Sequence, residues 1–503
     1  MTRSITLSLA LWIHLALAGT CPGAEGSPLL AGVAKVDITH PGSVSTRDRL
    51  HARALVLRSG DTTAVVVAVD VVAIGGIGPI GNDYLGKVRG ALNKELGINP
   101  GRVIVNASHC HGTVCSDVAD KTIEAVRKAH AALRPVVASA GTGREDRIQE
   151  NRRLRLKDGR EADVRHAYPV AADTEVTGAG PIDPDLGLLR LDQPDGTPVA
   201  VVFQFACHPI QGLPDGSNTA DLSGFAARTI EDSLGCTALF LQGCGGDINP
   251  IRYKDTGQPR DAEPLGVMLG TSALKTLGTL RGKPGATLRA FSERIELPRA
   301  DLTRDIARLE KEKESLVATL QGTSLDLKGF LELSARYGLA TDFPSAPAHQ
   351  YLHEAKLGRA ELRHLDAANR KNMQAYLANI RTMEQLTRVH TNLALLRRHQ
   401  KDNQEAGMRP VPVELTGLRV GDFYLVTFPG ELVAQIGLNL KKAVGKANHH
   451  VAGYTNGYIF YCPTAEQLKN RGGAQEDSDC LLATEWQAVF EPAALGLFRR
   501  LDP

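Results

Sequence analysis

Two histidines separated by one residue form the pattern in this sequence best suited to chemistry. His109 and His111 follow residues 103–105, a run of Val and Ile that is typical of a buried strand. In an extended segment, side chains two residues apart point to the same face, so both imidazoles can address one point at a strand end. From the pair alone, two interpretations stay open: a metal site, or rings that only satisfy hydrogen bonds in a core.

Further polar residues fall at the predicted ends of other strands. Together with the pair, the set is His109, His111, His208, Asp247, Glu431, Tyr458 and Tyr461. Two imidazoles and a carboxylate are a common catalytic zinc set, because three protein ligands leave a position for water. Zinc can lower the pKa of that water to about 7, which supplies hydroxide at neutral pH. The ligands are spread over more than three hundred residues, so spacing alone does not specify the site.

The elements that must position these residues alternate between strands and helices. We expect strands at 31–39, 51–57, 64–70, 103–105, 136–140, 186–191, 199–205, 238–242, 413–420, 423–428 and 451–454. Helices are expected at 83–95, 120–133 and 221–232, with another opening at Pro429-Gly-Glu431. Strands interleaved with helices predict an α/β fold, with layered mixed sheets flanked by helices.

Residues 301–402 have a different character. Apolar residues such as Leu302, Ile306 and Leu309 recur at spacings of three and four, as do Leu377 and Ile380, which predicts two long amphipathic helices. The proline-containing stretch 344–347 is expected to be a loop between them. We therefore expect a catalytic domain at 28–300 and 405–503 with a helical insertion at 301–402. The insertion is interpreted as a packed structural element, a lid or a dimer surface.

Composition narrows the function classes. The 503 residues are 43% hydrophobic and 23% charged, with a formal net charge of +2 and no long charged run. This charge pattern gives no indication of a basic surface for nucleic acid, so a small-molecule substrate is expected. Eight cysteines are too few for a disulfide scaffold of this size. We expect Cys110, Cys207, Cys244 and Cys462 to pack as small hydrophobic residues.

The first residues predict export. Arg3, an apolar run at 5–17 and the small residues Ala16 and Ala18 fit the three regions of a secretory signal peptide. We expect a signal peptide at 1–18, extending to about 24 at most, and a periplasmic or secreted protein. The apolar run is too short to span a bilayer, and no later stretch approaches the length of a transmembrane segment.

Five motifs follow one another along the chain: Asn-Ala-Ser-His-Cys-His at 106–111, Phe-Ala-Cys-His-Pro at 205–209, Gln-Gly-Cys-Gly-Gly-Asp-Ile-Asn-Pro at 242–250, Phe-Pro-Gly-Glu at 428–431 and Thr-Asn-Gly-Tyr-Ile-Phe-Tyr at 455–461. In this order they resemble the motifs of the neutral/alkaline non-lysosomal ceramidase family. Residues 31–39 and 150–152 resemble two further blocks of the family. The resemblance implies a ceramidase catalytic-domain-like fold that holds Zn²⁺.

The resemblance also implies residue roles. Zinc ligands would be His109, His208, Glu431 and Tyr461, with Tyr458 as the alternative tyrosine, because a metal ion favours a phenolate. His111 would be the hydrogen-bond partner or general acid/base beside the metal water. Arg152 would stabilise a developing oxyanion. Its alternative is an ordinary surface arginine within the basic cluster at 152–155.

The sequence departs from the family in three places. Asn249 stands where the family has its catalytic serine, so it cannot accept an acyl group, although it can donate a hydrogen bond to a substrate oxygen. Gly112 and Thr113 replace the usual Ser-Gly. No segment up to Pro503 matches the family's immunoglobulin-like C-terminal domain, and no tyrosine follows Tyr461. We therefore expect a divergent member without that serine and that domain.

The sequence thus predicts an exported zinc-dependent hydrolase that cleaves an amide (N-acyl) bond with metal-activated water, of the ceramidase-like, N-acylsphingosine amidohydrolase class. Its substrate would be a lipid amide or a polar acyl or glycan compound. Two alternatives stay open: a zinc deacylase or lyase acting on a polysaccharide or other polar substrate, and a non-enzymatic binding protein on the same scaffold.

Overall fold

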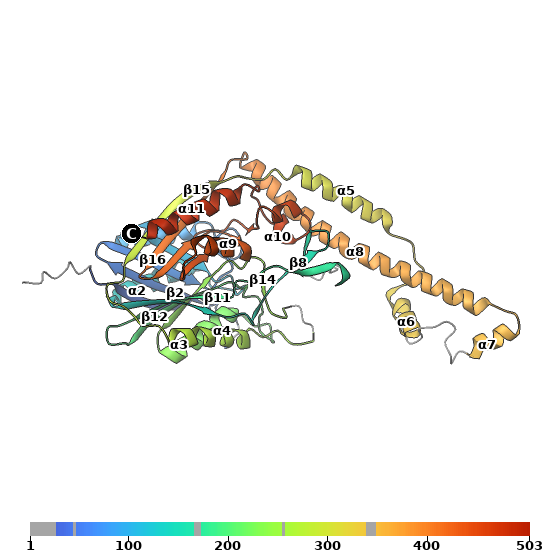
Figure 1. Ribbon diagram of the computed structural model, residues 1–503, viewed down its shortest axis with the longest axis horizontal. Helices are drawn as coiled ribbons and strands as arrows, with labels where there is room; N and C mark the ends of the chain where they lie inside the picture. The colour runs from blue at the N-terminus through green and yellow to red at the C-terminus, as the bar shows by residue number, and fades with distance from the viewer. Residues whose placement is uncertain (1–26, 44–46, 165–172, 254–256, 339–348, 503) are drawn as a thin grey trace, which may run out of the picture.

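Three sheets with helices on their outer faces form the body of the protein, and a long helical projection extends from it (Figure 1). The computed structural model describes residues 27–43, 47–164, 173–253, 257–338 and 349–502. The predicted signal peptide at 1–18 and the predicted loop at 344–347 lie outside the described residues. The predicted α/β class is confirmed, with layered mixed sheets flanked by helices.

The first sheet has five strands in the order β4-β3-β2-β1-β5. Their bounds are β1 Leu30–Asp37, β2 His51–Ser59, β3 Thr62–Val69, β4 Val103–Ala107 and β5 Arg134–Pro135. β3 and β4 are parallel, which needs the crossover helix α1 (Tyr84–Leu96) between them. Helix α2 (Val118–Ala131) turns Ile123 and Val126 toward the same core as α1. The outer face of this sheet is thereby covered.

The second sheet has four strands in the order β13-β12-β11-β6. Their bounds are β6 Val137–Arg144, β11 Asp185–Asp192, β12 Pro198–Phe205 and β13 Thr237–Gln242. β11 and β12 form the expected antiparallel hairpin, whereas β12 and β13 are parallel. Helices α3 (Asp221–Leu234) and α4 (Ala262–Leu277) pack over this sheet through Leu222, Ile230 and Leu269.

The third sheet has four strands in the order β15-β16-β17-β19. Their bounds are β15 Leu288–Leu297, β16 Val411–Val420, β17 Phe423–Thr427 and β19 His449–Ala452. Helices α9 (Ala434–Val444) and α11 (Trp486–Leu501) cover it. The helix expected to open at Pro429-Gly-Glu431 begins at Ala434 instead, because Glu431 belongs to the short strand β18 (Glu431–Leu432), which pairs with β20 (Tyr461–Cys462).

The inner faces of the three sheets share one apolar core. Val66 of the first sheet, Leu189 of the second and Leu418 of the third belong to a single buried cluster. Burial of apolar side chains from all three sheets is the main term that holds the layers together. Cys110, Cys207, Cys244 and Cys462 lie in the other buried clusters, between the sheets and their helices, as expected for packing residues.

Five further short strands form two small sheets. Their bounds are β7 Gln149–Asn151, β8 Arg153–Leu156, β9 Glu161–Asp163, β10 Val176–Ala179 and β14 Ile248–Pro250. β14 pairs with β7, while β8 lies between β10 and β9. A one-turn helix, α10 (Gln475–Ser478), is packed beside them.

The helical excursion contains four helices where two were expected. They are α5 Thr303–Thr319, α6 Leu327–Gly338, α7 His349–Lys356 and α8 Glu361–Glu405. The C-terminal part of α8 packs on α5 through Leu309, Val389 and Leu393. The N-terminal part of α8 carries α6 and α7 away from the body (Figure 1). Within the described residues, none of the helices combines the length and the apolar character needed to cross a membrane.

A buried histidine in the third sheet gives a pH-dependent stability. His450 is 1% exposed, stacks on Phe423, and has no hydrogen-bond partner at either ring nitrogen among the described residues. Burial lowers its pKa from 6.5 to about 3. Because the unfolded chain takes up this proton near pH 6.5 and the folded chain does not, stability is lost as the pH falls from about 6.5 toward 3.

We expect His450→Leu to reduce the loss of stability at acidic pH. Between pH 7.5 and pH 5, the wild-type free energy of unfolding should fall by about 2 kcal/mol more than that of the variant, since one pKa unit corresponds to about 1.4 kcal/mol. Urea unfolding at both pH values measures the difference. His390→Leu, at an exposed position on α8, is the control. Equal pH dependence in wild type and His450→Leu would contradict the prediction.

Candidate metal centre

Three buried side chains from different parts of the chain converge on one point. His109 follows β4, His208 follows β12 and Glu431 lies in β18. Each offers one ligand atom, and these atoms all lie within 4.8 Å of one another. His109 and His208 are each 2% exposed and Glu431 is 1% exposed. Two imidazoles and one carboxylate form a group that can bind a metal ion.

The hydrogen bonds of the two imidazoles fix their tautomers. Nδ1 of His109 lies 2.6 Å from the carbonyl oxygen of Val72, and Nδ1 of His208 lies 2.6 Å from that of Gly245. A carbonyl oxygen only accepts, so each Nδ1 donates its proton and each neutral ring carries its lone pair on Nε2. This arrangement, with Nδ1–H held by a backbone carbonyl, is the usual support of a metal-binding histidine.

The lone pairs point at an anion, which favours a cation between them. The Nε2 atoms of His109 and His208 lie 3.5 Å and 3.2 Å from Oε2 of Glu431. Among the described residues, Nε2 of His208 is buried without a hydrogen-bond partner. Buried electron pairs that face a carboxylate oxygen repel one another unless a positive charge lies among them. The donor set therefore fits a divalent metal ion, and its identity is not fixed by these contacts.

The protonation states also suit metal binding. Burial, with a smaller contribution from Arg152, lowers the pKa of His208 from 6.5 to about 3, so its ring is neutral at neutral pH. Burial opposes ionisation of Glu431, whereas the hydrogen bond that the Tyr458 hydroxyl donates to Oε1 favours the carboxylate by lowering its pKa. Metal ligands must be in these deprotonated forms.

The backbone around the centre is unusual in two places. His109 has a φ of 69°, in the left-handed region that costs a non-glycine residue roughly 1 kcal/mol or more. Its amide donates to the carbonyl of Val71 at 2.9 Å, and together with the Nδ1 contact this fixes the ring. At Gly246, a Cβ atom would lie 2.6 Å from the carbonyl oxygen of Glu431. Only glycine lets this loop approach the Glu431 strand so closely.

Three tyrosines surround Glu431. Tyr454 donates a hydrogen bond to Oε2 of Glu431 at 3.2 Å, and Tyr458 donates one to Oε1. Burial and the nearby carboxylate raise the pKa of both phenols well above 10. Tyr461 is the direct β-sheet partner of Glu431, and its hydroxyl accepts a hydrogen bond from Arg152 at 3.3 Å. Tyr454 was missed in the sequence, although its place at a predicted strand end was an available signal.

Arg152 is fully buried, so its interpretation as a surface arginine is wrong. Its Nε lies 2.6 Å from Oε1 of Glu476, its Nη2 donates to the carbonyl of Gly246 at 2.6 Å, and its Nη1 donates to Oδ1 of Asn249 at 3.1 Å. The guanidinium is therefore held in one orientation between α10 and the 243–250 loop. Nothing in the sequence pattern pointed to Glu476.

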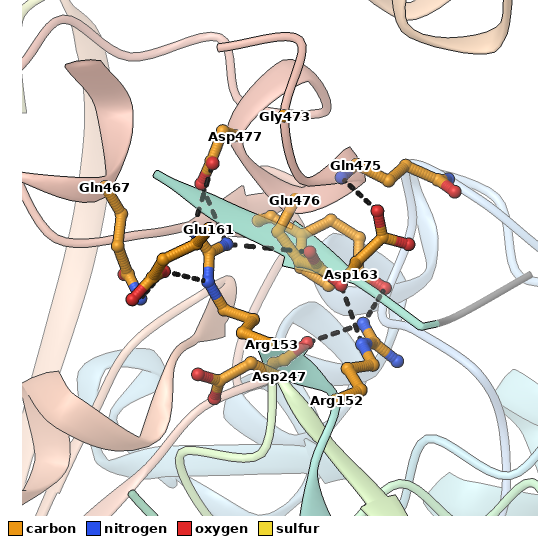
Figure 2. Close-up of polar contacts among 12 residues, drawn as sticks. Arg152, Arg153, Glu161, Asp163, Asp247, Gln467, Gly473, Gln475, Glu476 and Asp477 are labelled. Carbon is orange, nitrogen blue, oxygen red and sulfur yellow. Dashed lines mark hydrogen bonds and ion pairs between the residues drawn. The ribbon is translucent and has the colours of Figure 1, made fainter. Parts of the chain in front are cut away.

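A second buried arginine extends the same network (Figure 2). Arg153 makes two hydrogen bonds to Asp477, at 2.8 and 3.0 Å, and a third to Glu161 at 2.6 Å. Arg388 of α8 donates to Asp163 of β9 at 2.8 Å. Ion pairs thus connect the arginine at the metal centre with β9, α10 and the helical excursion. The inner half of α8 is accordingly a packed structural element.

A pocket of about 470 Å³ opens beside the metal centre. Its wall includes His111, Arg152 and His208, together with residues 216–219 and Asp221. His111 is exposed, with its ring centroid 5.4 Å from that of His109. Asn249 is 1% exposed, behind Arg152, and is not part of the wall. The structure therefore brings His111 and Arg152 together at the pocket, while their catalytic roles stay predictions.

The fold that carries this centre is a ceramidase-like fold. A crystal structure of neutral ceramidase from Pseudomonas aeruginosa matches the chain with a TM-score of 0.57 and 17% identity, over 94% of this chain and 75% of that one. A structure described as ceramidase complexed with C2 matches with the same TM-score and identity, over 94% and 76%. No family model and no curated protein sequence matches the chain. The predicted resemblance is thus shown for the fold.

Removal of either histidine should abolish metal binding. We expect purified protein to bind one zinc ion per chain, and His109→Ala and His208→Ala to lose it, because each substitution removes one of three ligand atoms. Elemental analysis after dialysis against zinc measures the stoichiometry. His111→Ala is the matched control and should keep its zinc. Full zinc occupancy in both ligand variants would contradict the site.

Removal of the carboxylate between the two arginines should destabilise the protein. Glu476→Gln leaves Arg152 and Arg153 buried with one negative charge fewer, which typically costs about 3 kcal/mol or more. Urea unfolding should show this loss. Glu466→Gln, which breaks the exposed pair with Lys469, should change stability by less than about 1 kcal/mol. Similar effects of the two substitutions would show that the buried network is not stabilising.

Proposed function

We propose that the protein is an exported zinc-dependent hydrolase that cleaves an amide bond. The observation that carries the proposal is the convergence of two Nε2 lone pairs and one carboxylate oxygen within 4.8 Å, beside an open pocket. Zinc held by His109, His208 and Glu431 would supply a Lewis acid for the scissile carbonyl and lower the pKa of water. The proposed export rests on the signal-peptide pattern of the first 18 residues.

His111 is proposed to move the proton. It is the exposed imidazole of the wall, next to His109, and it can exchange protons with substrate and solvent in the pocket. A ring nitrogen there can accept a proton from the attacking water and return it to the leaving amine. Its neighbours His109 and His208 cannot do this, because Nδ1 of each donates to a backbone carbonyl and Nε2 of each would hold the metal ion.

Arg152 is proposed to stabilise negative charge on the substrate oxygen. Glu476, Gly246 and Asn249 fix its guanidinium, so a developing oxyanion would meet a cation that needs no reorganisation. Asn249 accepts a hydrogen bond from Arg152, and we infer that it acts mainly by orienting this guanidinium. The predicted donation from Asn249 to a substrate oxygen stays a prediction.

Tyr461 is proposed as the fourth zinc ligand in preference to Tyr458. The phenols of Tyr454 and Tyr458 both donate to Glu431, and their raised pKa values keep them protonated. Tyr461 instead has a guanidinium at its hydroxyl, which favours negative charge on that oxygen. Its pairing with Glu431 places it in the same short sheet as a proposed ligand.

The pocket lining favours a polar acyl compound as substrate. His111, Thr113, Asn218 and Asp221 present hydrogen-bonding or charged groups, whereas Pro209 and Ile210 are the main apolar contributions. A long alkyl chain would displace water from this lining without replacing the hydrogen bonds of that water, which is unfavourable. We therefore keep a zinc deacylase acting on a glycan or similar polar N-acyl substrate as the second candidate, beside a lipid amide.

The zinc-loaded protein should hydrolyse an N-acyl bond. Two panels separate the candidates: short-chain fluorescent ceramides, and N-acetylated hexosamine oligomers, each followed by release of the free amine. His111→Ala should lower kcat by about 10² to 10⁴ while zinc stays bound. Asn249→Ser tests whether the family's serine restores ceramide cleavage.

Turnover of one panel identifies the substrate class. If His111→Ala had the same kcat as the wild type, His111 would have no role in the mechanism. Zinc-loaded, folded protein that cleaves neither panel would contradict the amidohydrolase and favour a binding protein.

A further inference from the structure

The projecting part of the helical excursion exposes apolar side chains. We define the arm as residues 327–338 and 349–385, which comprise α6, α7 and the outer part of α8 and extend away from the body in Figure 1. Eight of the thirteen exposed large hydrophobic residues in the described part of the chain lie on the arm. Leu327, Leu331 and Leu352 are 58 to 60% exposed. Exposed apolar side chains concentrated in this way are typical of a surface that binds a membrane or another molecule.

On α8, the exposed apolar residues share one face. At 100° per residue, Leu365, Leu377, Ile380 and Met383 fall within an arc of about 120°. This is the width of an ordinary buried stripe of an amphipathic helix. All four residues are nevertheless at least 40% exposed. The outer half of α8 therefore carries a stripe that its own fold does not bury.

On α6, the exposed leucines are separate from the packed face. Phe330 stacks on Tyr376 of α8 with centroids 4.8 Å apart, and the Tyr337 hydroxyl donates to Asp366 of α8. Leu327 and Leu331, four residues apart, lie on another side of the helix and remain exposed. The packing of α6 on α8 therefore does not account for these leucines.

The charge of the arm indicates the chemistry of its partner. Seven basic side chains of the arm are exposed, including Lys328, Arg336 and Lys371, against two exposed acidic ones, Glu332 and Glu361. The whole chain has a net charge of only +2, so the positive excess is local. Arg363 and Arg381 lie five helical turns apart, about 40° beyond the apolar stripe of α8. The stripe is thus bordered by positive charge on one side.

Apolar and basic side chains on one helical surface fit an anionic lipid bilayer. Leucine side chains enter the headgroup region, while lysine and arginine stay at the level of the lipid phosphates. A second copy of the arm would bring together two surfaces with the same positive excess, which is unfavourable. Charge complementarity therefore favours the bilayer over self-association.

The inner half of α8 gives the arm a fixed base. Arg388 donates to Asp163 and to the carbonyl of Gly473, Asn392 donates to the carbonyl of Gly472, and His399 is hydrogen-bonded to Asp479. These contacts hold the helix to the segment that also carries Glu476. The arm therefore extends from a part of α8 that hydrogen bonds fix to the body.

We propose that the arm docks on the surface of an anionic lipid bilayer, with its exposed leucines in the headgroup region and its basic residues against lipid phosphates. This binding does not depend on the hydrolase activity proposed above. It would place the protein at the bilayer surface through the arm.

Co-sedimentation of the whole protein with vesicles tests the proposal. We expect binding to vesicles of phosphatidylglycerol and phosphatidylcholine, weaker binding to phosphatidylcholine alone, and a decrease with salt. Arg363→Gln with Arg381→Gln should weaken binding by about 30-fold, from about 1 kcal/mol per basic residue. Leu327→Ser with Leu331→Ser should also weaken it. Val267→Ser with Val489→Ser, exposed outside the arm, is the matched control and should bind as wild type does.

The remaining outcomes would overturn the proposal. They are absence of vesicle binding, binding that the arm variants and the control lower equally, and a dimer in light scattering that the leucine variants dissociate without any vesicle binding. The last result would assign the arm to a second copy. Unchanged zinc content in each variant shows that the body is folded, so loss of binding is not loss of structure.

Discussion

The buried ion pairs around Arg152 and Arg153 are the interaction on which the functional region depends. The two arginines are adjacent in sequence and fully buried, and Glu476 lies between them, 2.6 Å from Arg152 and 3.6 Å from Arg153. Two neighbouring guanidiniums can remain in a core only if carboxylates compensate the loss of hydration. The α10 segment supplies this compensation, so the orientation of Arg152 at the pocket depends on a segment more than 320 residues away in sequence.

This dependence connects the helical excursion to the site. Arg388 and His399 of α8 hold the segments that carry Asp163 and Asp479, and these segments flank Glu476. The excursion therefore has two parts with different physical roles. Its inner half completes the network of buried charges, whereas its outer half exposes apolar and basic side chains that the body does not use.

Local rules predicted the strands, and the resemblance to the ceramidase motifs predicted the metal residues. Runs of β-branched residues fix strands such as β3, and the polar residues that follow such runs lie near strand ends, as His109 and His208 do. Glu476 and Asp477 follow no such rule, since their roles arise from contacts between distant segments. The placement of Glu431 in a short strand was likewise hidden, because that strand pairs with the later strand β20 through a hydrogen bond from the Glu431 amide to the carbonyl of Phe460.

The charges near Arg152 indicate why a cation suits the centre. The carboxylates of Glu431, Glu476, Asp477 and Glu161 outnumber the two guanidinium groups of Arg152 and Arg153. A buried excess of negative charge is unfavourable. A divalent cation at the histidines would compensate this excess. The fixed charges therefore favour a cation beside Glu431, while Arg152 favours negative charge on the oxygen of Tyr461, the tyrosine proposed as a ligand.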